Sequence, residues 1–169
     1  MVHPSDMALP LLALGAKVKI EGHQKKGRVI PLEEFFLKPS QSIAKENVLG
    51  PEEIVTEILI PHTQAGAKGV YLKERERRAW DHAIVGIAAI VAMEGGICRH
   101  ARIVLSGVAP APFRAVASED ILKGEKITEG LCLQAAEAAV STAKPLNHNR
   151  YKVHLAKALI KRAVLATLG

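Results

Sequence analysis

Residues 83–108 read AIVGIAAIVAMEGGICRHARIVLSGV, and this stretch decides the fold. Two apolar runs, 83–93 and 97–108, flank a turn at residues 94–96. Two runs rich in isoleucine and valine that are joined by a glycine turn favour a long β-hairpin. A buried helix is the alternative for the first run, because a short apolar run does not by itself distinguish a strand from a helix. The matched second run and the turn glycines favour strands.

The residues before this hairpin predict one short helix and several short strands. Residues 5–14 are apolar, with Ser5 or Asp6 available as the N-cap and Gly15 as the stop, so we expect a helix there. Residues 16–20 alternate between apolar and lysine side chains, the pattern of a strand with one wet face. We also expect a strand at 28–32, a helical turn at 33–36, a strand ending at 57–60 and an extended segment at 69–73.

The residues after the hairpin predict helices. Pro110 and Pro112 are expected to end the sheet, because proline cannot donate to a strand ladder. A short helix follows with its N-cap and first-turn acids at 118–120, then an alanine-rich helix at 130–143 and a long amphipathic helix at 147–168. Strands first and helices afterwards indicate an α+β protein whose sheet is antiparallel, not a doubly wound α/β sheet.

Composition excludes several classes of protein. The chain has 169 residues, of which 49% are hydrophobic and 24% charged, as in ordinary globular proteins. Two cysteines are too few for a disulfide scaffold and indicate free thiols in a reducing cytoplasm. The apolar runs are shorter than the roughly 20 residues that span a bilayer, so we expect no membrane segment. A net charge of +6 permits nucleic-acid binding, but only 4% of the residues are aromatic, so we expect none.

Motifs for nucleotide phosphates and metals are weak. Neither GxGxxG nor GxxxxGK[ST] occurs, so no single loop is identified that would hold a pyrophosphate. Cys98 and His100 lie two residues apart on an expected strand, which would place them on one face. No second ligand pair lies at zinc spacing, so we interpret them as a half-buried thiol beside a surface histidine.

A dense run of charges, KERERRAWD, occupies residues 73–81. One interpretation is a solvated, salt-bridged loop. The other is a segment that lines a site for an anionic, planar ligand, with Lys73 supplying charge and Trp80 a flat surface. Composition alone leaves both interpretations open.

Six segments, taken in order, resemble those of a known family. They are HPSDMALPLLALGAKVKI (3–20), RVIPLEEFF (28–36), LGPEEIVTEILIP (49–61), YLKERERRAWDHAIVGIAA (71–89), ARIVLSGVAPAPFRA (101–115) and NRYKVHLAKALIKRAV (149–164). Together they look like the flavin-binding subunit of the molybdenum hydroxylases, the enzymes of the xanthine dehydrogenase and aerobic carbon monoxide dehydrogenase type.

The resemblance implies an electron-transfer role. Such subunits bind FAD and pass electrons from iron–sulfur clusters on a small subunit to NAD or another acceptor, while a large molybdopterin subunit hydroxylates the substrate. The motif matches imply FAD contacts at Asp6, at Val55 through its backbone, and at Lys73, with the loop that contains Trp80 near the flavin ring. In this interpretation residues 1–62 are the end of an FAD-binding domain and residues 63–169 are the flavoprotein C-terminal domain.

The sequence also departs from the family pattern. The glycine-rich loops that hold the FAD pyrophosphate belong to an N-terminal half that has no counterpart in this sequence. We therefore expect the isolated chain to bind FAD weakly or not at all, and a separate N-terminal FAD-binding polypeptide to complete the site. The competing hypothesis is an assembly module that docks onto the other hydroxylase subunits without binding flavin. The substrate and the electron acceptor are not specified by these residues.

Overall fold

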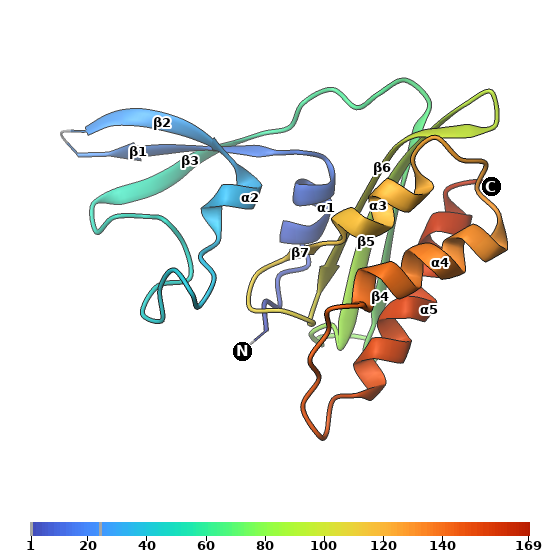
Figure 1. Ribbon diagram of the computed structural model, residues 1–169. Helices are drawn as coiled ribbons and strands as arrows, with labels where there is room; N and C mark the ends of the chain where they lie inside the picture. Colours follow the sequence, from blue (N-terminus) through green and yellow to red (C-terminus); the bar gives the residue numbers. More distant parts are fainter. Residues whose placement is uncertain (1, 24) are drawn as a thin grey trace.

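The computed structural model describes residues 2–23 and 25–169, which form two antiparallel sheets and a set of helices (Figure 1). The elements in chain order are α1 (Ala8–Ala13), β1 (Lys17–Gly22), β2 (Lys25–Pro31), α2 (Leu32–Phe35), β3 (Glu53–Leu59), β4 (Ala67–Glu74), β5 (Val85–Glu94), β6 (Ile97–Ser106), β7 (Phe113–Arg114), α3 (Val116–Leu122), α4 (Glu129–Val140) and α5 (Tyr151–Ala166). The antiparallel sheets with C-terminal helices confirm the α+β prediction.

The β5–β6 hairpin is confirmed and forms the centre of the larger sheet, whose strand order is β4-β5-β6-β7. Gly95 and Gly96 make its turn with positive φ angles of 58° and 80°, which glycine adopts without strain. Figure 1 shows α3, α4 and α5 on one face of this sheet and α1 on the other.

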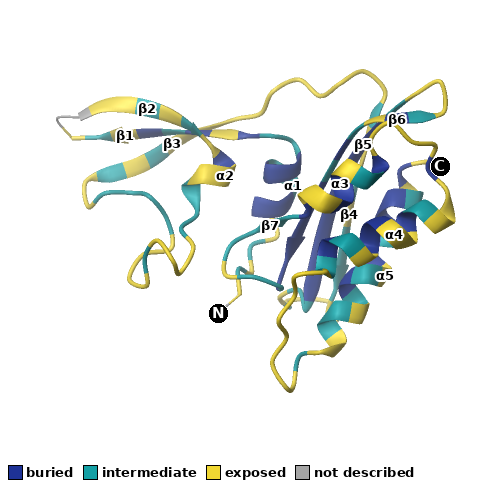
Figure 2. Cartoon of the chain, viewed as in Figure 1, coloured by how far each residue is buried: buried dark blue, intermediate teal, exposed yellow. Residues whose placement is uncertain are grey.

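Both faces of β5 are buried, which explains why its sequence is apolar throughout (Figure 2). Ile87, Ala89 and Val91 face the core beneath α3, α4 and α5. Ala88 and Ile90 face a smaller core that they share with α1 and the three-stranded sheet. A strand covered on both faces needs no polar positions, so its sequence loses the two-residue period.

The smaller sheet has the order β2-β1-β3 and extends away from the rest of the molecule in Figure 1. Val18 and Ile20 of β1 face the smaller core, where they pack with Leu9 and Leu12 of α1. The lysines of β1 alternate with them, and Lys19 pairs with Glu57 on the neighbouring β3 at 2.6 Å. The wet-face prediction for this strand is confirmed.

One sequence expectation fails because of a β-bulge. The β5–β6 register shifts between Ala92, which pairs with His100, and Met93, which pairs with Cys98. Cys98 is buried in the larger core together with Ala101, so the strict alternation breaks between these two residues. Cys98 and His100 therefore do not form a same-face pair. Within the described part of the chain, no cluster of His, Cys, Asp or Glu could hold a metal ion.

Two further expectations at the end of the sheet are wrong. The chain does not leave the sheet at the prolines, because Phe113 and Arg114 return to pair with Leu105 and Val104 as the short strand β7. Helix α3 begins at Val116, so Ser118 lies inside it and is no N-cap. The buried Ser118 hydroxyl instead donates to the Ala135 carbonyl of α4 at 2.8 Å.

The other helices lie close to their expected positions. Thr128 caps α4 by accepting a hydrogen bond from the Leu131 N–H, and α5 buries Ala156, Leu159, Ile160, Ala163 and Val164. In residues 2–23 and 25–169 we find no helix long and apolar enough to cross a membrane.

Candidate functional site

Asp6, Tyr71 and Lys73 form a polar cluster between the N-terminal segment and strand β4. The Lys73 ammonium lies 2.6 Å from Asp6 Oδ2, and the Tyr71 hydroxyl donates to Asp6 Oδ1 at 2.9 Å. The Lys73 side chain is 12% exposed and that of Asp6 45% exposed. The two carboxylate oxygens thus each have one internal partner, and the carboxylate still faces solvent on one side.

Local structure explains how residues 65 positions apart meet. Tyr71 and Lys73 are two residues apart on β4, so their side chains project to the same side. Asp6 stands in the turn before α1, where the Ser5 hydroxyl accepts the Ala8 N–H at 3.1 Å. Gly86 of β5 pairs with Lys73 of β4. The missing side chain lets α1 approach β5 closely, because a Cβ at this position would lie 3.3 Å from Leu9 of α1.

The cluster favours an ionised Asp6. Burial raises the pKa of Asp6, but the hydrogen bonds from Lys73 and Tyr71 outweigh it, so the net pKa lies below the ordinary 3.8. Burial and the bond to Asp6 raise the pKa of Tyr71. The folded form therefore holds the Asp6 proton less tightly than the unfolded chain. The cluster contributes its full stabilisation above the unfolded-state pKa and loses it as the pH falls through the lower, folded-state pKa.

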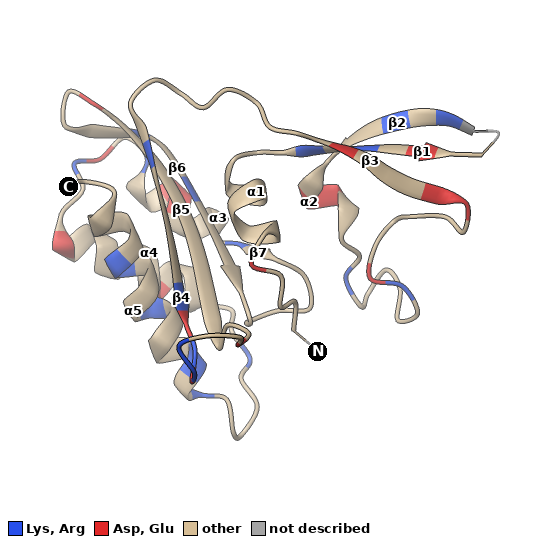
Figure 3. Cartoon of the chain, turned by 180° about the vertical axis from the view of Figure 1, so that it is seen from behind, with Lys and Arg blue, Asp and Glu red and all other residues tan. Residues whose placement is uncertain are grey.

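Trp80 lies in the charged loop after β4. Among the described residues, no hydrogen bond or ion pair connects it with Asp6, Tyr71 or Lys73. Its side chain is 97% exposed, and its φ of 54° is unusual for a bulky residue. The Arg77 N–H donates to Asp81 Oδ2 at 2.9 Å, and the Arg77 guanidinium donates to the Trp80 carbonyl at 3.2 Å. These bonds close the loop around Trp80, and Figure 3 shows acidic and basic positions alternating where β4 ends.

Val55 lies on a different element. It stands on β3 opposite Ile20 of β1 and packs against the smaller core. Among the described strands, only β1 pairs with β3, so the outer edge of β3 keeps backbone groups available for a ligand. No hydrogen bond or ion pair of the described residues connects Val55 with Asp6 or Lys73. The structure therefore brings together Asp6 and Lys73 and leaves Val55 and Trp80 apart from them.

The sequence did not single out Tyr71 as a site residue. Its position two residues before Lys73 on an expected strand would have indicated that the two side chains share a face.

We expect Tyr71→Phe to raise the pKa of Asp6 towards 3.8, because the carboxylate loses one of its two side-chain donors. A carboxyl-carbon NMR titration measures this pKa directly. Tyr151→Phe, on α5, is the matched control and should leave it unchanged. An Asp6 pKa that is equal in wild type and Tyr71→Phe would contradict the role of this hydroxyl.

Comparison with known proteins assigns the two parts of the chain to two family models. Residues 70–167 match the CO dehydrogenase flavoprotein C-terminal domain, and residues 1–63 match the FAD binding domain in molybdopterin dehydrogenase. Asp6 lies in the segment that matches the FAD binding domain, and Lys73 lies in the segment that matches the flavoprotein C-terminal domain. The polar cluster thus connects the two matched segments.

Individual relatives agree with this assignment. The chain is 33% identical to the aldehyde oxidoreductase FAD-binding subunit PaoB of Escherichia coli strain K12, over 92% of this chain and 45% of that protein. It is 30% identical to the carbon monoxide dehydrogenase medium chain of Hydrogenophaga pseudoflava, over 97% and 56% respectively.

Solved structures show the same fold. The carbon monoxide dehydrogenase structure from Hydrogenophaga pseudoflava matches 98% of this chain and 56% of that chain, with a TM-score of 0.85 at 30% identity. Quinoline 2-oxidoreductase from Pseudomonas putida 86 matches with a TM-score of 0.80 at 26% identity, over 97% and 56%. The chain spans about half the length of the curated relatives it matches. It belongs to the family of FAD-binding medium subunits of the molybdenum hydroxylases.

Proposed function

We propose that this chain supplies part of the FAD site of a molybdenum hydroxylase, with Asp6 and Lys73 as cofactor contacts. The observation that carries the proposal is the Lys73–Asp6 ion pair of 2.6 Å, braced by Tyr71. It places a half-exposed carboxylate, an ammonium and a phenol within one hydrogen-bonded cluster. Carboxylates accept from the hydroxyls and ring N–H groups that FAD carries, and the ammonium complements its acceptor oxygens.

The residues present fit one part of FAD better than another. The pyrophosphate is usually held by backbone N–H groups of a glycine loop at a helix N-terminus. The Gly95-Gly96 pair forms the β5–β6 turn, whereas Lys73 pairs with Gly86 at the other end of β5. This glycine pair therefore lies away from the cluster. The proposal assigns this chain to the flavin or ribityl part and the phosphate loops to another polypeptide segment, so that FAD binds weakly to this chain by itself.

The names of the relatives support an electron-transfer role in a larger assembly. They include an FAD-binding subunit and a medium chain, names given to components of larger complexes. Bound FAD would supply the redox chemistry that passes electrons from iron–sulfur clusters of a small subunit to NAD or another acceptor, while a molybdopterin large subunit hydroxylates the substrate. The residues of this chain orient the ring and set its electrostatic surroundings. The charged loop with Trp80, together with the Val55 backbone, supplies the other contacts that this chain makes with FAD.

A titration observed by NMR tests this function. We expect millimolar FAD to shift the backbone amide signals of Asp6, Tyr71 and Lys73, and FMN to produce the same shifts. ADP, which lacks the flavin, should leave them in place. Asp6→Asn and Lys73→Gln should each weaken FAD binding by at least about tenfold, because each removes a charged hydrogen-bond partner worth about 1.5–3 kcal/mol.

Lys19→Gln provides the matched control for loss of a lysine charge. Lys19 pairs with Glu21 and Glu57 on the three-stranded sheet, and FAD binding should not change when it is replaced. If FAD shifts none of the amide signals of a well-folded chain, and the other hydroxylase subunits still bind this chain, the chain is an assembly module instead. Tight FAD binding by the chain alone would contradict the assignment of the phosphate loops to another segment.

A further inference from the structure

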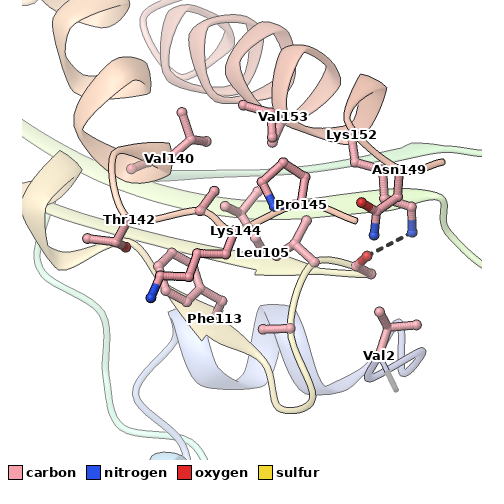
Figure 4. Close-up of a pocket in the computed structure, with 16 residues that line it drawn as sticks. Val2, Leu105, Phe113, Val140, Thr142, Lys144, Pro145, Asn149, Lys152 and Val153 are labelled. Carbon is pink, nitrogen blue, oxygen red and sulfur yellow. Dashed lines mark hydrogen bonds between the residues drawn. The ribbon is translucent and has the colours of Figure 1, made fainter. Parts of the chain in front are cut away.

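A pocket in the C-terminal part of the chain lies between the end of the larger sheet and the loop that joins α4 to α5 (Figure 4). Its volume is about 280 Å³. Its apolar walls come from β6, β7, α4 and α5 and include Leu105, Phe113, Val140, Val153 and Ala156. The polar cluster around Asp6 does not line this pocket, so it is separate from the proposed flavin contacts.

The charged side chains that line this pocket are basic. Among the described residues, Lys144 and Lys152 line it, and no Asp or Glu does. Lys152 lies in the first turn of α5, which also contains no acidic residue. Its ammonium donates to the Gly107 carbonyl at 3.0 Å, a bond that Figure 4 shows at one end of the pocket. A carbonyl is neutral and takes one of the three ammonium N–H groups, so Lys152 keeps its positive charge and further donors for a ligand.

The other two lysines of α5 show what Lys152 lacks. Lys157 pairs with Glu137 of α4 at 2.6 Å, and Lys161 pairs with Glu129 of α4. The residues of α4 that line the pocket are apolar, so the half-buried Lys152 has no acidic partner among the described residues. Removing an ammonium from water without a counter-charge costs free energy, and an anionic ligand in the pocket would offset that cost.

We propose that this pocket binds a small organic carboxylate whose apolar body is a single ring. The carboxylate accepts hydrogen bonds from the Lys152 ammonium. The ring packs against Leu105, Val140 and Val153, and Lys144 adds a second positive charge. Sites for drug-sized ligands have volumes of about 300–1,000 Å³, so a pocket of about 280 Å³ favours a smaller ligand. A neutral ligand of the same shape leaves the charge of Lys152 unmatched.

The test uses benzoate as the probe and the methyl NMR signals of Leu105, Val140 and Val153 as the readout. We expect saturable shifts of these signals at millimolar benzoate. Benzamide has nearly the same shape but no charge, and it should bind about tenfold more weakly, because hydrogen bonds between charged groups are the stronger ones. Equal or tighter binding of benzamide, or no shift of these methyl signals with benzoate, would each overturn the proposal.

Three variants separate a carboxylate site from an apolar hollow. Lys152→Met removes the ammonium and should abolish the preference for benzoate over benzamide, while both still bind weakly. Lys157→Met is the matched control, because Lys157 lies on the same helix but does not line the pocket, and the preference should remain. Val153→Phe should fill the pocket and remove binding of both probes. Circular dichroism establishes that each variant is folded. A preference for benzoate that persists in folded Lys152→Met, or binding that persists in folded Val153→Phe, would contradict the proposal.

Discussion

Replacing Arg114 by methionine is expected to lower the free energy of unfolding by about 3 kcal/mol. Arg114 holds the carboxylate of Glu119, which is 5% exposed, through its Nε and one terminal nitrogen, the latter at 2.8 Å. Glu119 also accepts the Ile103 N–H at 2.9 Å. Without the guanidinium, this buried carboxylate keeps, among the described residues, only the hydrogen bond from the Ile103 N–H. The hydrogen bond to Glu119 likewise raises the pKa of Arg114.

Urea unfolding of wild type and variant measures this loss. Arg99→Met is the matched control, because Arg99 forms an ion pair of 2.8 Å with Glu94 on the exposed hairpin end. Exposed pairs contribute less than about 1 kcal/mol, so this variant should unfold close to the wild-type urea concentration. An Arg114→Met chain as stable as Arg99→Met would mean that the buried carboxylate finds another partner.

Replacing Gly107 by alanine is expected to destabilise the chain by at least about 3 kcal/mol. Gly107 has a φ of 73°, and a Cβ there would lie 2.4 Å from the Ile84 carbonyl oxygen. Because the obstacle is backbone next to strand β5, it cannot move aside as a flexible side chain can. The left-handed backbone adds strain for any residue with a Cβ. Thermal unfolding followed by circular dichroism should therefore show a clearly lower midpoint.

Gly130→Ala is the matched control for this substitution. Gly130 lies in the first turn of α4 and has nothing within 4 Å of an added Cβ. Alanine favours the helix by about 0.5–1 kcal/mol over glycine, so this variant should melt at or above the wild-type midpoint. Opposite effects of the same glycine-to-alanine change would separate steric exclusion at Gly107 from backbone entropy. A neutral Gly107→Ala would show that the backbone at Ile84 moves to make room for the added Cβ.

The sequence predicts the elements well wherever local patterns dominate. The hairpin, the wet-faced strand β1 and the long helix α5 follow from glycine turns and from periods of two or 3.6 residues. The failures concern groups whose partners are distant in the chain. Glu119 is a first-turn acid of α3 as expected, but the local pattern does not predict that its carboxylate turns inward to accept the N–H of Ile103, which lies 16 residues earlier. The bulge that separates Cys98 from His100 likewise depends on pairing with β5.

The candidate site was likewise predictable only where a local pattern or the family resemblance indicated a residue. Asp6 and Lys73 could be paired before the structure only through the family resemblance, since no rule of spacing joins residues on separate elements. Tyr71 was within reach of the strand period but was not singled out. Val55 and Trp80 stay predictions, because their contacts depend on a ligand and on chain segments beyond those that surround Asp6.

The β5–β6 hairpin lies between two cores, and this arrangement has a consequence for fragments of the protein. Helix α1 precedes the exposed connection at residues 60–66, yet it packs on strands that follow this connection. A protease that cut the connection would sever the chain while the two pieces remained held together by the apolar contacts of α1 with β5 and β6. Each piece expressed alone would expose half of a core. Co-expression of the two pieces would be the route to a folded protein, because each piece supplies a surface that the other needs to fold.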